Sequence, residues 1–392
     1  MKKLLSWAIV ICMVLSLLPV TAHAASGSCG ENVSWSLENG VLTISGTGAT
    51  NDYTTGQTPW YSSRNAICSV VVTDGVTRIG NGLLERIAAV SVTLPDSVTE
   101  IGEYAFQYCE QLETVRLGPG VKTIGTGAFS LCAALTGIQL PEGLRRIPTN
   151  CFYRSGLREI EIPEGVVFVN DGAFRQCMSL ERIIFPESAT GLLSNCLDGT
   201  TNLKIVQLPS KLKSIPYGMF VGSGIERIEL PEGLQSIGRN AFQGCNNLTE
   251  VIIPDSVTFI DDGAFNSCKE LPTVALPEGL ETISYGLFRD SGITDIVIPV
   301  SVTVIEMYAF EGCWKLKNVT FSGTAPDGML SAFEGCTALE YIELPQGMDS
   351  IPSGMFWKAG IRELTIPEGV ESIGNRAFRD NKNLESWWSR PL

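Results

Sequence analysis

The chain has 392 residues, of which 44% are hydrophobic and 18% charged. This composition supplies a core and excludes a chain that is disordered throughout. The only histidine, His23, lies in a segment that we expect to be removed, which excludes Ser-His-Asp triads, Cys-His pairs and His-ligated zinc from the mature protein. The net charge of −14 excludes nucleic acid as a partner, because phosphate backbones would be repelled.

Residues 1–24 have the pattern of a secretory signal peptide. Lys2 and Lys3 precede an apolar run from Leu4 to Val20, and Ala22-His23-Ala24 forms a small-residue cleavage site. No later stretch approaches the roughly 20 apolar residues of a membrane span. We therefore expect an exported protein that does not insert into a membrane after cleavage.

Residues 25–71 form a predicted β-rich N-terminal cap. Two alternating apolar segments, Val33 to Leu37 and Val41 to Ser45, flank Asn39-Gly40. This dipeptide is typical of the type I′ turn of a β-hairpin. Trp60, between Pro59 and Tyr61, is a predicted packing point, and we expect the cap to close the first of the repeats that follow.

Residues 72–388 consist of about 14 repeats of 22–23 residues. In the unit that starts at Leu94, the last residues alternate apolar and polar side chains, which predicts a short strand. The proline that follows cannot donate to a ladder and ends the strand. The next apolar residues, from Val98 to Cys109, are spaced by three and four, which predicts a helical or 3-10 turn.

Such units cannot bury their apolar residues alone, so they must stack. The predicted fold is an α/β-type, mostly β leucine-rich solenoid. Parallel strands form a continuous sheet on one face, and short helical or 3-10 turns form the other. Because the last unit is not followed by a capping unit, we expect residues 389–392 to be irregular and the chain to be truncated there.

The repeats resemble the BspA-like class of bacterial leucine-rich repeats. The segment from Ala241 to Pro254, Ala-Phe-Gln-Gly-Cys-Asn-Asn-Leu-Thr-Glu-Val-Ile-Ile-Pro, carries the resemblance most closely. The resemblance implies a secreted or surface-displayed protein, with adhesion to host or matrix proteins in some relatives. Attachment to a cell surface would then require an anchor outside this chain.

Cysteine occupies the sixteenth position of seven repeats, and Thr200 and Asn381 replace it in two others. The seven are Cys109, Cys132, Cys177, Cys245, Cys268, Cys313 and Cys336. Neighbouring thiols one coil apart could form disulfides in an exported protein. We favour buried, reduced thiols, since Cys177 faces Thr200 and buried cysteine acts as a small apolar residue. The spacing lacks a CxxC pair, so we expect no metal site and no cofactor.

The tightest acidic groupings are Asp261 with Asp262, and Glu159 with Glu161. Paired carboxylates are the groups that glycosidases use. These residues occupy ordinary solvent-facing positions of the repeat, so we predict no catalytic residues and no enzyme. An acidic-dyad glycosidase remains a remote alternative.

The positions that flank the inward residue of each strand should point outward from the sheet. Between Arg182 and Val297 these positions carry several β-branched apolar residues. One interpretation is a docking surface for a ligand. The other is that Ile and Val occur there only because strands favour them. The predicted ligand-binding residues on this sheet face are Arg182, Ile184, Arg227, Ile252 and Val297. We expect them in one contiguous row, with the two arginines able to bind carboxylates.

Together these features predict a non-catalytic binding or adhesion module, secreted or displayed at the cell surface. Its expected partner is an extracellular protein or glycan. The alternative is a passive structural component of the cell envelope or matrix.

Overall fold

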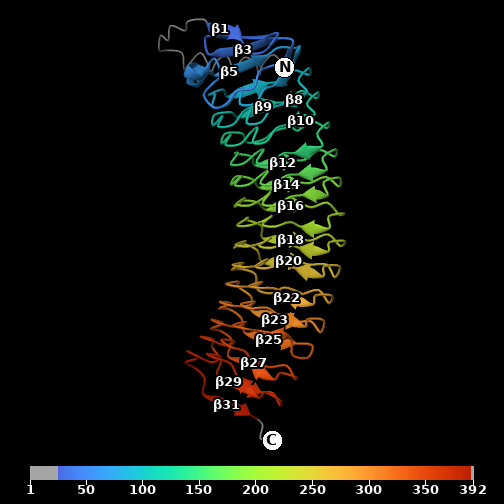
Figure 1. The fold of residues 1–392 in the computed structure, drawn as a ribbon, viewed down its shortest axis with the longest axis vertical. Coiled ribbons are helices and arrows are strands. Elements are labelled where there is room, and N and C mark those ends of the chain that lie inside the picture. Colours follow the sequence, from blue (N-terminus) through green and yellow to red (C-terminus); the bar gives the residue numbers. More distant parts are fainter. Residues whose placement is uncertain (1–24, 390–392) are drawn as a thin grey trace. The chain divides into compact units, whose positions relative to one another are not determined.

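The computed structural model describes residues 25–389, so the predicted signal peptide and residues 390–392 lie outside the described part. The chain divides into two compact units, Met1–Pro163 and Glu164–Leu392, and each is treated separately below. In both units, successive coils contribute short parallel strands (Figure 1). The predicted mostly β solenoid is therefore confirmed.

The first unit begins with antiparallel strands. These are β1 (Ala25–Ser28), β2 (Val33–Glu38) and β3 (Val41–Gly46), followed by β4 (Gly48–Ala49) and the 3-10 helix η1 (Tyr61–Ala66). β2 and β3 form the predicted hairpin, and Asn39 and Gly40 have the positive φ values of a type I′ turn. Trp60 is buried, with its ring centroid 5.3 Å from that of Trp35. Trp60 is thus a packing point, while the capping role of this region remains a prediction.

The coils of the first unit form two parallel ladders. One ladder contains β5 (Ser69–Val72), β7 (Ser91–Thr93) and β9 (Thr114–Arg116), and β12 (Glu159–Glu161) is not paired with β9. The other contains β4, β6 (Val76–Ile79), β8 (Glu100–Ile101) and β10 (Thr123–Ile124), and β11 (Arg146–Ile147) is not paired with β10. β3 pairs in parallel with β5, so the hairpin joins the first ladder directly.

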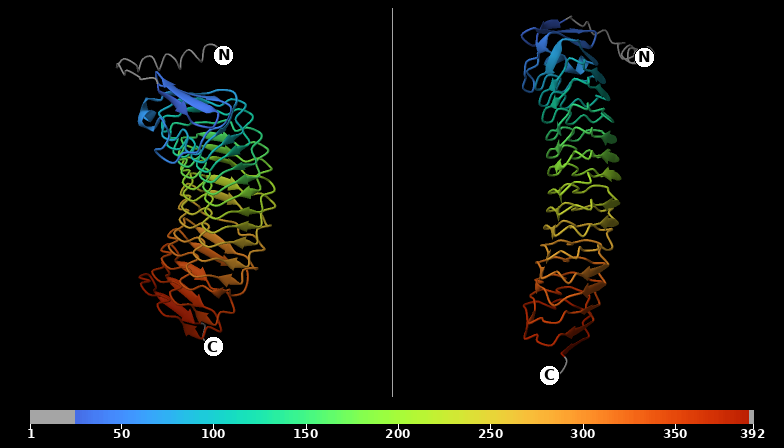
Figure 2. Two further views of the ribbon diagram at one scale, coloured as in Figure 1. Left: turned by 45° about the horizontal axis from the view of Figure 1, so that its top comes forward. Right: turned by 90° about the vertical axis from the view of Figure 1, so that its right-hand side faces the viewer.

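The second unit repeats this arrangement, and Figure 2 shows its strands from two further sides. Its sheet face contains β14 (Arg182–Ile184), β16 (Ile205–Gln207), β18 (Arg227–Glu229), β20 (Glu250–Ile252), β23 (Asp295–Ile298), β25 (Asn318–Phe321), β27 (Tyr341–Glu343), β29 (Glu363–Ile366) and β31 (Ser386–Ser389). Its second ladder is divided into four separately paired groups: β13 (Phe168–Val169) with β15 (Gly191–Leu192); β17 (Ser214–Ile215), β19 (Ser236–Ile237) and β21 (Phe259–Ile260); β22 (Thr282–Ile283), β24 (Val304–Ile305) and β26 (Asp327–Gly328); and β28 (Ser350–Ile351) with β30 (Ser372–Ile373). β31 includes Ser389, which the sequence had placed in the irregular terminus.

The sheet face is interrupted rather than continuous as predicted. In the first unit, residues 137–139 form no strand, and Gly137 weakens the strand at that position. In the second unit, residues 273–275 form no strand. Pro272 precedes them and lacks the N–H that Thr249, one coil earlier, donates to the Glu226 carbonyl at 2.8 Å.

The turns that join the two ladders are not helical, contrary to the sequence prediction. Tyr104 and Phe106 donate their N–H groups to the next coil at 2.8 Å, whereas Gln107 donates within its own turn to Tyr104. Two positions of each coil between Val72 and Asp380 have a left-handed backbone, which interrupts any helix. The first, with φ between 51° and 67°, comprises Gly82, Tyr104, Gly127, Asn150, Gly172, Asn195, Gly218, Asn240, Gly263, Gly286, Tyr308, Ser331, Gly354 and Arg376. The second, with φ between 54° and 72°, comprises Arg86, Tyr108, Leu131, Arg154, Gln176, Gly199, Gly222, Gly244, Ser267, Asp290, Gly312, Gly335, Lys358 and Asp380.

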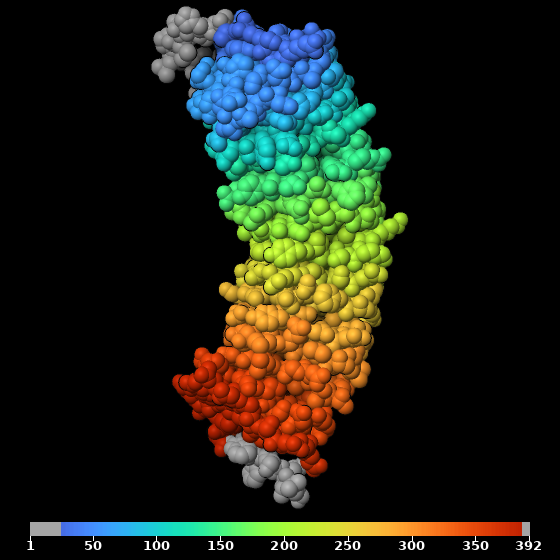
Figure 3. All heavy atoms as spheres, viewed as in Figure 1, coloured from blue at the N-terminus to red at the C-terminus, as the bar shows by residue number. Residues whose placement is uncertain are grey.

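Stacked phenylalanines run through the core beneath these turns. In the second unit, ring centroids from Phe220 to Phe378 lie 5.1 to 5.8 Å apart, with interplanar angles of at most 15°. Within each unit, neighbouring coils lie against one another on the face in view (Figure 3). Within residues 25–389, no helix combines the length and the apolar composition that a bilayer crossing requires.

Candidate ligand-binding surface

The strands of the second unit place one side chain inward between two that face solvent. Ile228 is buried between exposed Arg227 and Glu229, and Ile296 is buried between exposed Asp295 and Val297. This alternation follows from the two-residue period of a strand. The inward and outward positions therefore agree with the register read from the repeat.

The five predicted site residues lie on this face, but in two rows rather than one. Arg182 and Arg227 occupy the row before the inward residue, where their strand partners are Ile205 and Glu250. Ile184, Ile252 and Val297 occupy the row after it. The reason is the strand period: residues two apart point the same way but stack on different neighbours.

Arg227 is not an unpaired anchor for a carboxylate. The Arg227 guanidinium forms an ion pair with Glu250, with Nη1 and Oε2 3.1 Å apart. Arg182 and Val297 are separated by five inter-strand steps, on the order of 24 Å. The structure thus spreads the predicted residues along the face, and only Val297 lines the hollow described next.

A hollow of about 560 Å³ opens on the sheet face where the strand is missing, and we call it the sheet-face groove. Two features of one coil create it: Pro272 interrupts the ladder, and Ala275 places a small side chain at an outward position. The groove is lined by Thr273, Val274, Ala275, Leu276, Glu278, Asp295, Ile296, Val297, Pro299, Asn318 and Thr320. Val297 is 56% exposed, and Val300, after Pro299, is 66% exposed.

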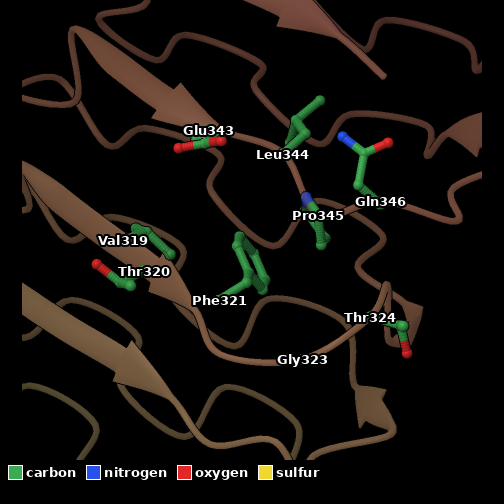
Figure 4. Close-up of a pocket in the computed structure, with 9 residues that line it drawn as sticks. All are labelled: Val319, Thr320, Phe321, Gly323, Thr324, Glu343, Leu344, Pro345 and Gln346. Carbon is green, nitrogen blue, oxygen red and sulfur yellow. The ribbon is translucent and has the colours of Figure 1, made fainter. Parts of the chain in front are cut away.

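A second hollow, of about 280 Å³, adjoins this groove through Thr320, which lines both. Figure 4 shows the Phe321 side chain between β25 and the turn at Pro345. In this coil Ser322 stands where most coils have proline after the strand, and Gly323 and Thr324 line the hollow. The two hollows extend one apolar region over adjacent coils.

The sheet-face groove is acidic at its rim. Glu278 and Asp295 are exposed carboxylates that line it. Hydrogen bonds from Asn318 Nδ2 and from Thr294 Oγ1 (2.6 Å) lower the pKa of Asp295, so its negative charge persists at acidic pH. An apolar groove with fixed carboxylates suits an apolar ligand group that carries a neighbouring cation.

The repeat cysteines lie inside the core, and their predicted burial is confirmed. Cys245 Sγ donates to the Phe220 carbonyl at 3.0 Å, and Cys313 Sγ donates to the Phe288 carbonyl at 2.9 Å. Burial raises the pKa of both thiols from 9.0 to about 12. Neutral thiols that link consecutive coils therefore have a structural role, and Asn381 makes the same bond to the Phe356 carbonyl.

Neither acidic grouping contributes a residue to the lining of the groove. Glu159 and Glu161 are exposed on either side of buried Ile160 in the first unit. Asp261 and Asp262 follow β21 in the second unit, and the Asp262 N–H donates to Asp261 Oδ1 at 2.7 Å. Within residues 25–389, no group of three or more cysteine, aspartate, glutamate or histidine side chains is arranged to hold a metal ion.

The sequence reasoning missed the groove itself. Pro272 and Ala275 were visible signals, because a proline directly before the strand and an alanine at an outward position both weaken it. The hydrogen bond from Asn318 to Asp295 could not be read from the sequence, since it joins residues one coil apart.

Comparison with known proteins supports the architecture. The family model described as "BspA type Leucine rich repeat region (6 copies)" matches residues 59–178, 145–272, 235–327 and 260–385. A leucine-rich repeat protein from Bacteroides ovatus is 26% identical, with a TM-score of 0.71 over 91% of this chain and 93% of that one. A leucine-rich repeat protein from Eubacterium ventriosum is 22% identical, with a TM-score of 0.50 over 92% of this chain and 95% of that one, which supports the fold alone.

The search of curated proteins gives no match. The matched ranges together span residues 59–385, which is most of the chain. The chain therefore belongs to the BspA-type leucine-rich repeat family.

Proposed function

We propose that this protein is a secreted or surface-displayed, non-catalytic binding module that holds an extracellular protein or glycan on the sheet face of its second unit. The observation that carries the proposal is the sheet-face groove, with exposed Val297 beside it. An exposed apolar surface with a polar rim is typical of an interaction site.

The rigidity of the scaffold supports binding at this face. Each coil is fixed to its neighbours by backbone hydrogen bonds and by the stacked core. A preformed surface loses little conformational freedom when a ligand docks, which favours affinity. Of the five site residues predicted from the sequence, only Val297 lines the sheet-face groove.

The experiment is an array of extracellular proteins and glycans probed with residues 25–392. Wild type is compared with Val297→Lys and with the matched control Phe259→Lys. Phe259 is 50% exposed and lies on the second ladder, so it has similar exposure outside the groove. We expect a specific partner whose binding falls at least tenfold with Val297→Lys and is unchanged with Phe259→Lys.

Three results would contradict the proposal. Absence of any partner would favour a passive structural component. Equal loss of binding in both variants would place the partner elsewhere, and cleavage of a glycan would indicate an enzyme. Circular dichroism melts of each variant separate loss of binding from loss of folding.

A further inference from the structure

A third hollow in Glu164–Leu392 lies on the turns rather than on the sheet face. It has a volume of about 270 Å³, and its lining includes Met307, Tyr308, Leu330, Trp357, Asn375 and Arg376, a set that we call the Trp357 pocket. These residues come from four successive coils. The pocket is independent of the sheet-face groove, since the two share no lining residue.

Small residues keep the floor of this pocket open. Ser331, Ser353 and Gly354 lie among the large side chains. Gly354 has a φ of +67°, and a Cβ there would collide with Ser331 Oγ. A side chain at this position would therefore be strained and would fill the space.

The electrostatics of the pocket are opposite to those of the whole chain, whose net charge is −14. Arg376 is the one charged residue in the described lining. Lys358 Nζ lies 4.6 Å from the Trp357 ring centroid, and the guanidinium carbons of Arg376 and Arg379 lie 5.4 and 5.8 Å from it. Asp380 accepts the Trp357 indole N–H at 3.1 Å, and Arg379 lies 3.7 Å from the same carboxylate oxygen.

This combination selects a class of ligand. Aromatic and aliphatic side chains offer an apolar surface, and the Arg376 guanidinium can bind a carboxylate through two parallel hydrogen bonds. Ser353 and Asn375 add polar groups that can form hydrogen bonds with hydroxyl groups of a ligand. A sugar ring has an apolar C–H face, hydroxyl groups at its edge and, in uronic acids, a carboxylate.

We propose that the Trp357 pocket binds a uronic acid residue of an acidic polysaccharide, with the carboxylate on Arg376 and the ring against the side chains of Trp357 and Tyr308. The site is open to solvent and suits one residue of a chain that continues beyond it. This proposal goes beyond the sheet-face function, and either can fail without the other.

The test is calorimetric titration of residues 25–392 with trigalacturonic acid, its methyl ester and inorganic phosphate. We expect saturable binding of trigalacturonic acid, with at least tenfold weaker binding of the ester and of phosphate. Arg376→Gln should weaken trigalacturonic acid binding by about 10- to 100-fold, the range for a lost hydrogen bond to a charged group. Trp357→Leu should weaken it as well.

The matched control is Arg239→Gln, which removes the same charge from an exposed arginine on a turn of another coil. We expect it to bind like wild type, as should Val297→Lys. The proposal is overturned if trigalacturonic acid fails to bind at millimolar concentration, if phosphate binds equally well, or if Arg376→Gln and Arg239→Gln have the same effect. Melting curves check that every variant is folded.

Discussion

The stacked phenylalanines should couple energetically only to their nearest neighbours. Phe242 is fully buried, with its ring centroid 5.1 Å from that of Phe220 and 5.3 Å from that of Phe265. Phe242→Ala removes the ring and leaves a cavity, so it should lower the free energy of unfolding by about 3–5 kcal/mol. Phe242→Leu keeps most of the apolar volume and isolates the loss of two stacked contacts, each worth about 0.5–1.5 kcal/mol.

Double-mutant cycles measured by urea unfolding separate these contributions. The pair Phe242→Leu and Phe265→Leu shares one stacked contact, so its coupling energy should be about 0.5–1.5 kcal/mol. Phe242 and Phe310 are separated by Phe265 and Phe288. Their coupling should lie within about 0.5 kcal/mol of zero. Equal coupling for both pairs would refute the nearest-neighbour description of these coils.

Three further predictions concern the buried thiols, one left-handed backbone position and the Asp295 carboxylate. Burial raises the pKa of Cys245 and Cys313 from 9.0 to about 12, so these thiols ionise at lower pH in the unfolded chain than in the folded protein. The free energy of unfolding should therefore fall as the pH rises from 9 to 12. In urea titrations, the double variant Cys245→Ala, Cys313→Ala should show a smaller fall than wild type. Asn240 has a left-handed backbone with a φ of 54°, so Asn240→Val should lower the free energy of unfolding by about 1–2 kcal/mol. Asn240→Gly should lower it by less, because glycine adopts this conformation without strain. Equal losses in the two variants would contradict a preference set by the backbone at this position. Asn318→Leu should raise the pKa of Asp295 toward its usual 3.8, because it removes the Asn318 hydrogen bond that contributes most to lowering that pKa. NMR titration measures the change, and an unchanged pKa would show that Asn318 is not the cause.

The fold could be predicted because repeats specify register many times over. Ile228 and Ile296 lie inward, since shifting a strand by one residue would expose every apolar side chain. The turns could not be predicted in the same way. Their spacing of three and four fits a helix, and the left-handed positions carry residues as different as Gly263, Tyr308 and Arg376, although glycine and asparagine are frequent there.

The candidate site was predicted less completely, for a different reason. The residue type at an outward position is not restricted by core packing, so the sequence does not show which side chains will pair there. Arg227 was predicted to be free to bind a ligand carboxylate, whereas Glu250 on the next strand forms an ion pair with it. The Trp357 pocket draws on residues from Met307 to Arg376, and the separation of their side chains depends on how four coils stack. The sequence spacing does not determine that distance.

Hydrogen exchange on residues 25–392, with and without the partner found on the array, tests the central claim most directly. A ligand in the sheet-face groove should slow exchange of backbone amides in residues 273–275, 295–297 and 318–320. Amides of the second ladder, such as those of β21, should be unaffected. Protection confined to the second ladder or to the turns, with none in these three segments, would contradict binding at the sheet face.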